Sequence, residues 1–237
     1  MGPRVCPRSL RELKVQAAEA GGAVLTLLGN HEVMNVCGVA GPYISTAGRT
    51  AFGSDRAAAF APGGALAREM STWPVVCIVG DTAFCHAGLT FETARDAAQI
   101  NAEAARWLCE GTARKPPPSL MPTTDAAAAT SPVWMRTLSA PSGAEPAPPA
   151  AASLTAALAH LGASRLVVGH TPQRQINCAC DGTVWRIDVA LSKAMGGGAI
   201  EALEIDERGV RVLTQRGAPV DAARRQARAQ RQAGARR

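Results

Sequence analysis

The sequence has 237 residues, a length that suits one large domain or two small ones. Its hydrophobic content of 47% is that of a globular protein, although aromatic residues make up only 4%. Seven arginines and one aspartate lie in residues 216–237, so the net charge of +6 is a property of this end of the chain. The rest of the chain is therefore close to neutral, so its charge does not indicate a nucleic-acid partner. Its composition does not indicate a membrane span either.

The seven cysteines are an odd number and are scattered in apolar contexts. This usage indicates reduced thiols in an intracellular protein, without deciding between the cytoplasm and a plastid. Cys178 and Cys180 form a C-x-C pair, but no second pair stands at zinc-ribbon spacing. We expect them to pack on one side of a strand rather than to bind zinc.

The first half of the chain reads as a helix over 9–20, capped by Ser9, and then a short apolar strand over 24–28. Because this run does not alternate, it predicts a strand buried on both faces. Gly29 ends it, and a polar loop follows. The further expected elements are helices over 51–61, 65–72 and 91–110 and a β-hairpin formed by 75–79 and 83–86.

The second half begins with a segment rich in Ala and Pro, residues 112–151, which we expect to bury little. Only the island from Pro132 to Arg136, which contains Trp134, is expected to dock on the body. The remaining expected elements are a helix over 152–161, a buried strand over 165–169, and hairpins formed by 175–179 with 183–189 and by 199–205 with 209–214.

Three apolar runs end in the same way, with a histidine beside a glycine. His31 follows Gly29, His86 precedes Gly88, and His170 follows Gly169. Three of the four histidines thus stand at strand ends, where α/β sheets place their ligands. Histidine is costly to bury without a partner, so core filling is a poor explanation for all three. The fourth histidine, His160, is interpreted as a surface residue of a helix.

An Asn oxygen and two imidazoles form a plausible half-shell for a divalent transition ion. Asn30, His86 and His170 are the candidates for these ligands, and His31 is then free to donate a proton. Neutral ligands leave the charge of the ion largely unquenched, so it retains Lewis acidity. This combination is typical of metal-assisted hydrolysis of a phosphate ester.

The motifs Gly29-Asn30-His31-Glu32, His86-Ala87-Gly88-Leu89 and Gly169-His170-Thr171 together resemble the calcineurin-like metallophosphoesterases. Within these, the chain is similar to the Shewanella-like branch of the phosphoprotein phosphatase family. The resemblance implies an α/β fold, a β-sandwich flanked by helices. It also implies a pair of divalent ions, manganese or iron and zinc, and a phosphoprotein substrate attacked by a metal-held hydroxide.

The same resemblance implies roles for individual residues. Asn30, His86 and His170 match ligands of the second metal, and His31 matches the general acid. Arg136 is a candidate phosphate contact, with a solvated arginine beside Trp134 as the alternative. Glu32 is expected to orient its loop, and Gly88 to let the backbone pass close to the site.

The family's Gly-Asp motifs, which supply the first metal's ligands, do not occur before Gly29. The sequence thus predicts a partial fold that lacks the N-terminal βαβ portion and the first-metal ligands, with doubtful activity. Asp81 and Asp188 are poor substitutes and are expected to be structural. The open alternatives are a non-catalytic pseudophosphatase and a dinucleoside polyphosphate hydrolase. The predicted parts are two phosphoesterase segments, 1–111 and 152–216, the insert 112–151, and a basic disordered tail, 217–237.

Overall fold

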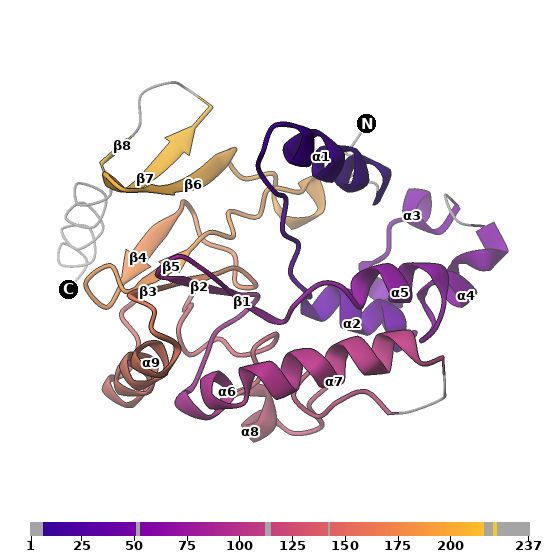
Figure 1. The fold of residues 1–237 in the computed structure, drawn as a ribbon, viewed down its shortest axis with the longest axis horizontal. Coiled ribbons are helices and arrows are strands. Elements are labelled where there is room, and N and C mark those ends of the chain that lie inside the picture. Colours follow the sequence, from indigo (N-terminus) through magenta and orange to yellow (C-terminus); the bar gives the residue numbers. More distant parts are fainter. Residues whose placement is uncertain (1–6, 51–52, 112–114, 142, 216–219, 222–237) are drawn as a thin grey trace.

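The computed structural model describes residues 7–50, 53–111, 115–141, 143–215 and 220–221. Two β-sheets lie against each other, and helices cover the outer face of the larger sheet (Figure 1). This arrangement confirms the predicted α/β class with a helix-flanked sandwich. No helix among the described residues is long and apolar enough to cross a membrane.

The larger sheet has the strand order β1-β2-β3-β5-β4. Strand β3 runs parallel to β2 and to β5, and the two outer pairs are antiparallel hairpins. The predicted hairpins around Asp81 and Asp181 are therefore confirmed. The strands are β1 Val76–Val79, β2 Thr82–Cys85, β3 Arg165–Val168, β4 Asn177–Ala179 and β5 Val184–Arg186.

Strand β3 is buried on both faces, as its unbroken apolar run predicts. Leu166 and Val168 pack into the larger core with the helices, whereas Val167 packs into a second core toward the smaller sheet. Residues of β2 divide in the same way, with Ala83 on the helical side and Phe84 on the other. One sheet thus separates two cores.

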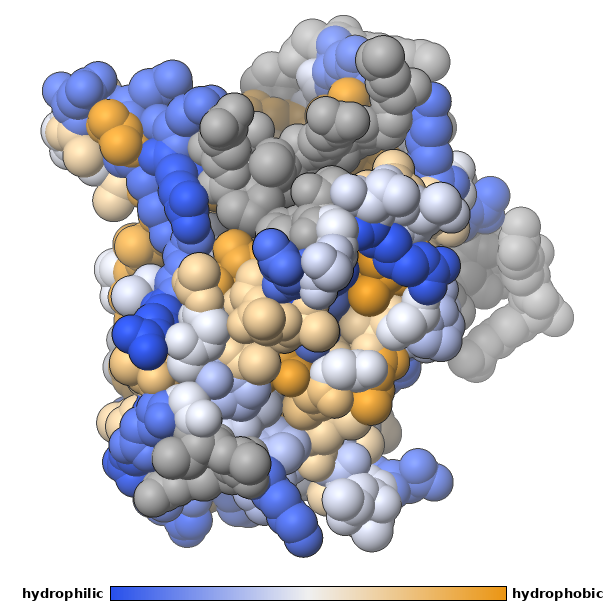
Figure 2. All heavy atoms as spheres, turned by 90° about the vertical axis from the view of Figure 1, so that its right-hand side faces the viewer, coloured by the Kyte–Doolittle hydropathy of each residue, from blue (hydrophilic) through white to orange (hydrophobic). Residues whose placement is uncertain are grey.

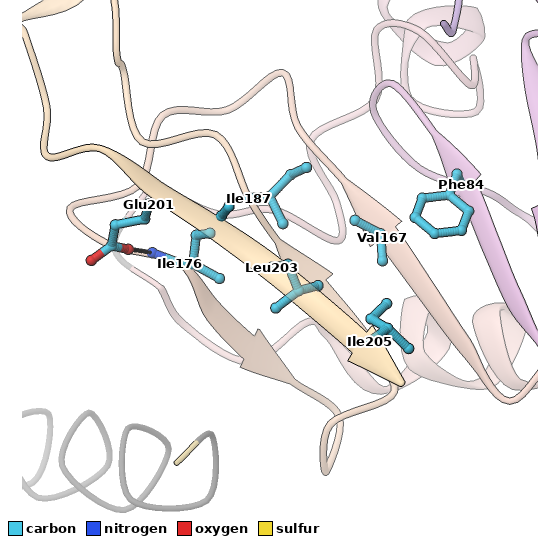
Figure 3. Close-up of a pocket in the computed structure, with 8 residues that line it drawn as sticks. Phe84, Val167, Ile176, Ile187, Glu201, Leu203 and Ile205 are labelled. Atoms are coloured by element: carbon cyan, nitrogen blue, oxygen red, sulfur yellow. Dashed lines mark hydrogen bonds between the residues drawn. The ribbon is translucent and has the colours of Figure 1, made fainter. Parts of the chain in front are cut away.

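The smaller sheet consists of β6 Glu201–Asp206, β7 Gly209–Thr214 and β8 Val220–Asp221. Between it and the larger sheet lies an apolar cavity of about 520 Å³ (Figure 3). Phe84 and Val167 line it from one sheet, and Leu203 and Ile205 from the other. At one end Glu201 accepts a hydrogen bond from the main-chain nitrogen of Ile176, so the two sheets are joined beside the cavity.

Most of the helices lie on one side of the larger sheet or beside it (Figure 1). Helices α6, α7 and α9 cover the larger sheet, and the short α2 to α5 lie beside them (Figure 1). On the side of α3 and α4, apolar residues gather in the middle of the surface between hydrophilic ones (Figure 2). The bounds are α1 Pro7–Glu19, α2 Asn30–Val36, α3 Thr46–Thr50, α4 Arg56–Phe60, α5 Ala65–Met70, α6 Phe91–Arg95, α7 Ala97–Cys109, α8 Asp125–Ala128 and α9 Pro148–Leu161, with the 3₁₀ turns η1 Gly41–Tyr43, η2 Gly53–Asp55 and η3 Lys193–Met195.

The predicted buried strand over 24–28 is wrong. This segment belongs to no helix or strand and pairs with no described strand, and its one main-chain bond among the described residues runs from Leu28 N to the oxygen of Pro74, at 3.0 Å. Leu25 is 62% exposed, whereas Leu28 is fully buried. A strand forms only where a neighbouring strand hydrogen-bonds to it, and the sequence of the segment itself does not show whether such a neighbour exists. The polar loop after Gly29 is also wrong, because α2 begins at Asn30.

Several helix boundaries differ from prediction. Within the predicted helix over 51–61, the described residues form the 3₁₀ turn η2 and the five-residue helix α4. Helix α1 begins at Pro7, so Ser9 lies inside it and is not its cap, and proline is well tolerated in a first turn. The predicted helix over 91–110 is interrupted at Asp96, between α6 and α7. Helix α9 begins at Pro148 rather than 152 for the same reason as α1.

The segment 112–151 buries far more than its composition indicates. Leu120, Val133 and Leu138 are fully buried in the larger core. A few apolar residues are enough to anchor this segment, because the rest of the protein provides the surface against which they pack. The four-part division of the chain stays a prediction, and the predicted basic tail 217–237 lies outside the described residues apart from Val220–Asp221.

Candidate active site

Three side chains meet at the C-terminal edge of the larger sheet. His86 Nε2 lies 2.8 Å from Asn30 Oδ1 and 3.2 Å from His170 Nδ1. Asn30 is the first residue of α2, and His86 and His170 follow β2 and β3. These strands are parallel neighbours, so their carboxyl ends coincide. The bond from Gly169 N to His86 O, 2.8 Å, ties the two ends together.

The orientation of His170 is fixed by its backbone and by a distant carbonyl. His170 has a φ of 65°, and Thr171 N bonds to Gly169 O at 2.7 Å, so a tight three-residue turn carries the imidazole. His170 Nε2 lies 3.0 Å from the carbonyl oxygen of Trp134, which can only accept a hydrogen bond. The proton therefore resides on Nε2, and Nδ1 presents its lone pair to His86 Nε2, 3.2 Å away.

Gly29 leaves the space that His86 occupies. A Cβ atom at Gly29 would lie 2.9 Å from His86 Nδ1 and 2.8 Å from Glu32 Oε2. The Glu32 carboxylate accepts a hydrogen bond from Gly29 N, 3.0 Å, at the start of α2. This confirms that Glu32 orients its segment, and it explains why glycine precedes Asn30.

Both imidazoles of the cluster are neutral at physiological pH. Burial lowers the pKa of His86 to about 3, and the charges of His170, His31 and Arg136 act in the same direction. Burial also lowers the pKa of His170 to about 4, with the Arg136 charge as the next cause. A neutral imidazole is the form that ligates a metal ion.

The cluster suits a divalent transition ion. Ligand atoms about 2.1 Å from one ion and at right angles to each other stand about 3 Å apart. The distances of 2.8 Å and 3.2 Å around His86 Nε2 match this spacing. In the described part of the chain no three His, Cys, Asp or Glu side chains form a metal-binding group, so the amide oxygen of Asn30 completes this set.

His31 and Arg136 flank the cluster. His31 is exposed, and its ring meets that of Tyr43 edge-on, with centroids 5.0 Å apart. Arg136 donates through Nη1 to Thr171 Oγ1 at 2.9 Å and to the carbonyl oxygen of His170 at 3.4 Å. All five predicted site residues, Asn30, His31, His86, Arg136 and His170, therefore lie in one region.

Two further predicted residues lie elsewhere. Asp81 sits in the β1–β2 turn and accepts bonds from Ser164 and Arg165, so it is structural, as expected. His160 is exposed on α9 and contacts Phe91, with ring centroids 5.9 Å apart. Gly88 was expected to let the backbone pass close to the site, but it instead makes room for the side chain of Met135, since a Cβ atom there would lie 2.6 Å from its sulfur.

Asp188 follows β5 and lies closer to the site than expected. Its Oδ1 accepts a hydrogen bond from Ala190 N, 2.9 Å, as a structural residue does. Its charge nonetheless acts to raise the pKa of His170, against the larger opposing effects. Asp188 thus combines a turn-forming role with an electrostatic one.

The C-x-C pair does not face one side of a strand. Cys178 packs into the core between the sheets, and Cys180 packs into the larger core. Cys180 follows β4 with a φ of 49°, which breaks the strand alternation. All six described cysteines are free thiols; Cys6 lies outside the described residues.

Sequence reasoning missed three members of the site: the Trp134 carbonyl, the Thr171 hydroxyl and the Tyr43 ring. The first is a main-chain group and leaves no mark in the sequence. Thr171 belongs to a recognised motif, but nothing local shows that its hydroxyl meets Arg136. Tyr43 is the chain's only tyrosine, and it reaches His31 through the turn η1.

Comparison with known proteins finds relatives of one phosphatase branch by sequence and proteins of one fold by structure. No family model matches the chain. Shewanella-like protein phosphatase 2 of Arabidopsis thaliana is 30% identical over 254 residues, covering 86% of this chain and 63% of the relative. The cold-active protein-tyrosine phosphatase of a psychrophilic Shewanella species is 22% identical, with a TM-score of 0.65, covering 90% of this chain and 62% of that one.

A point mutant of a cold-active protein tyrosine phosphatase matches equally well, with 21% identity and a TM-score of 0.65. The chain spans less than two thirds of the length of each of these proteins. The structures share the partial sandwich described above, and the sequence similarity specifies the branch. The chain is therefore a relative of the Shewanella-like protein phosphatases.

Proposed function

We propose that this protein is a metal-dependent phosphoesterase that hydrolyses phosphomonoesters on proteins. The observation that carries the proposal is the convergence of Asn30 Oδ1 and His170 Nδ1 on His86 Nε2, at 2.8 Å and 3.2 Å. Two neutral imidazoles and an amide oxygen are the donors that a divalent transition ion accepts. A guanidinium and an exposed imidazole beside them supply what a phosphate substrate needs.

Asn30, His86 and His170 are the residues that would hold one ion, the second of a pair for which manganese or iron and zinc are the candidates. When bound, a divalent ion supplies Lewis acidity to phosphoryl oxygens and to water. The chain contributes the preorganisation of its ligands. Burial keeps both imidazoles neutral, and the Trp134 carbonyl fixes the ring of His170.

His31 is the proposed general acid. It follows the ligand Asn30 directly, is exposed, and has its ring turned edge-on to Tyr43. An imidazolium in this position protonates the oxygen of the departing alcohol. Arg136 is the proposed phosphate contact, since a guanidinium binds two phosphate oxygens at once.

The substrate class and the setting rest on the relatives. Their names are those of protein phosphatases, so a phosphorylated protein is the proposed partner of this chain. The free thiols accord with an intracellular setting. The proposed division into two phosphoesterase segments, an insert with a docked Trp134 and Arg136, and a basic tail accompanies this function.

The first experiment measures metal content and turnover of the full chain. We expect manganese to bind, and we expect hydrolysis of phosphopeptides to be weak and to occur only in its presence. The variants Asn30→Ala and His170→Ala should lose manganese by calorimetry. If the chain binds no manganese, or binds it without any turnover, the result would support a non-catalytic pseudophosphatase. Cleavage of dinucleoside polyphosphates alone would change the substrate class.

A second experiment tests His31 through the leaving group. The variant His31→Asn should lower kcat for a phosphoserine peptide by about 10²–10⁴-fold, because an alkoxide leaves poorly without a proton. With p-nitrophenyl phosphate, whose leaving group needs no proton, the loss should be much smaller. Equal losses on both substrates would remove the acid role from His31.

A further inference from the structure

Arg136 is an exposed residue whose guanidinium is held at one corner. Its Nη1 donates to Thr171 Oγ1, 2.9 Å, and to His170 O, 3.4 Å. Among the described residues no partner meets its Nε or Nη2. These two nitrogens form one edge of the planar group, the fork that binds two oxygens of a carboxylate or a phosphate.

The hydroxyl that holds Arg136 is itself buried and bound. Thr171 is 1% exposed and Ser139 is fully buried, and Ser139 Oγ donates to Thr171 Oγ1 at 2.8 Å. Gln173 adds a second tie, since its Nε2 donates to the carbonyl oxygens of Ala140, 3.2 Å, and of Thr171, 3.0 Å. Thr171 therefore offers a fixed acceptor, whereas a surface hydroxyl would rotate in solvent.

A buried arginine, Arg186, anchors the segment that carries Arg136. Arg186, which is 1% exposed, donates from Nε to Leu138 O and from Nη2 to Ala144 O, each at 2.8 Å. Its third contact is Asn177 Oδ1 at 3.4 Å. Both ends of the contact between Arg136 and Thr171 are thus set on rigid supports, the sheet and the β3–β4 connection.

Resting on the proposed function, we propose that Thr171 is the positioning residue for Arg136 and turns its Nε–Nη2 edge toward the substrate phosphate. A free arginine loses side-chain entropy when it becomes fixed. Thr171 supplies part of this ordering before the phosphate arrives. The role differs from a general packing role, because it is exerted through Arg136 alone.

The chain offers a matched control in Thr82. This residue is 2% exposed, and its Oγ1 accepts a hydrogen bond from Arg165 Nη1, 3.0 Å, at the opposite end of the same sheet. The substitutions Thr171→Val and Thr82→Val therefore remove the same chemical contact from a buried threonine. Thr171→Ser retains the hydroxyl and serves as the rescue variant.

The test measures the dissociation constant of inorganic phosphate by calorimetry, with manganese present. Thr171→Val should weaken phosphate binding by about 10-fold, the effect of one hydrogen bond to a charged group. Thr171→Ser and Thr82→Val should bind as the unaltered chain does. In an Arg136→Ala background, Thr171→Val should have no further effect, because the group it positions is gone.

A second readout needs no ligand. In ¹⁵N relaxation measurements, the Nε–H group of Arg136 should be ordered in the unaltered chain and become as mobile as that of the exposed Arg174 in Thr171→Val. Unchanged order of Arg136, or equal losses of affinity with and without Arg136, would overturn the role of Thr171. Absence of phosphate binding in the unaltered chain would instead overturn the proposed function, and with it the phosphate-directed role.

Discussion

His170 Nε2 lies 3.0 Å from the carbonyl oxygen of Trp134, which precedes it by 36 residues. A segment rich in Ala and Pro thus fixes the protonation and direction of a proposed metal ligand. The segment is held in turn by Trp134 itself, whose indole nitrogen donates to Leu120 O at 2.7 Å. Removing this anchor should therefore weaken metal binding, although no ligand residue is changed.

Trp134→Ala should lower the affinity for manganese about 10-fold, because partners that orient a ligand have effects of this size. Trp134→Phe keeps an aromatic ring but loses the indole hydrogen bond to Leu120 O, so it should cost about 1 kcal/mol of stability and little affinity. The matched control is Trp73→Phe, since no described residue is bound to the Trp73 indole nitrogen. Equal manganese affinities across all three variants would contradict the anchoring role.

Gly29→Ala should displace His86. The added Cβ would meet His86 Nδ1 at 2.9 Å and Glu32 Oε2 at 2.8 Å, closer than ordinary contacts allow. Manganese titration should show a loss of about 10- to 100-fold. Gly22→Ala is the control, since its Cβ would meet only Ala17 O, at an ordinary 3.5 Å. A Gly29→Ala chain with normal metal binding would mean that His86 can shift freely.

Arg186→Met should be among the most destabilising substitutions outside the apolar core. It leaves the buried carbonyl oxygen of Leu138 without the donor Nε and removes the bond to Ala144 O. Urea denaturation should show a loss of about 3 kcal/mol. Arg165→Met, which breaks a partly exposed ion pair with Asp81, should cost less than about 1 kcal/mol. Similar losses for both variants would show that the bonds of Arg186 contribute little.

Acid should destabilise the metal-free chain through His86 and His170. Burial lowers the pKa of His86 from 6.5 to about 3 and that of His170 to about 4. Below the unfolded value of 6.5, the unfolded chain binds protons that the folded chain refuses. The contribution of these two groups to the free energy of unfolding is therefore fully present above that pH, and it is lost as the pH drops toward their pKa values in the folded chain.

Urea titrations between about pH 7 and pH 4 measure this dependence. His86→Asn removes one of the two groups and should flatten the fall, while the carboxyl groups remain as they are. Asp206 is one such group, because its bonds to Arg211 and Arg208 lower its pKa to about 2. An identical pH dependence in His86→Asn would show that this imidazole does not govern acid stability.

The site motifs were predictable because each one is local. A short apolar run followed by a histidine beside a glycine marked His31, His86 and His170, and the ordered set of motifs indicated the phosphatase resemblance. The hairpins were equally predictable, since Asp81 and Asp181 stand between runs of strand length. Such features depend on backbone preferences and side-chain chemistry within a few residues.

Pairing and anchoring were decided only by the tertiary structure. The apolar run 24–28 has strand composition but pairs with no described strand, and the segment 112–151 is poor in large apolar residues yet packs against the body. The contacts that orient the site, from His170 to Trp134 and from Arg136 to Thr171, join residues more than thirty positions apart. Sequence chemistry determined which groups are candidates for binding metal and phosphate, and long-range packing determined where they point, because direction depends on partners that no local pattern specifies.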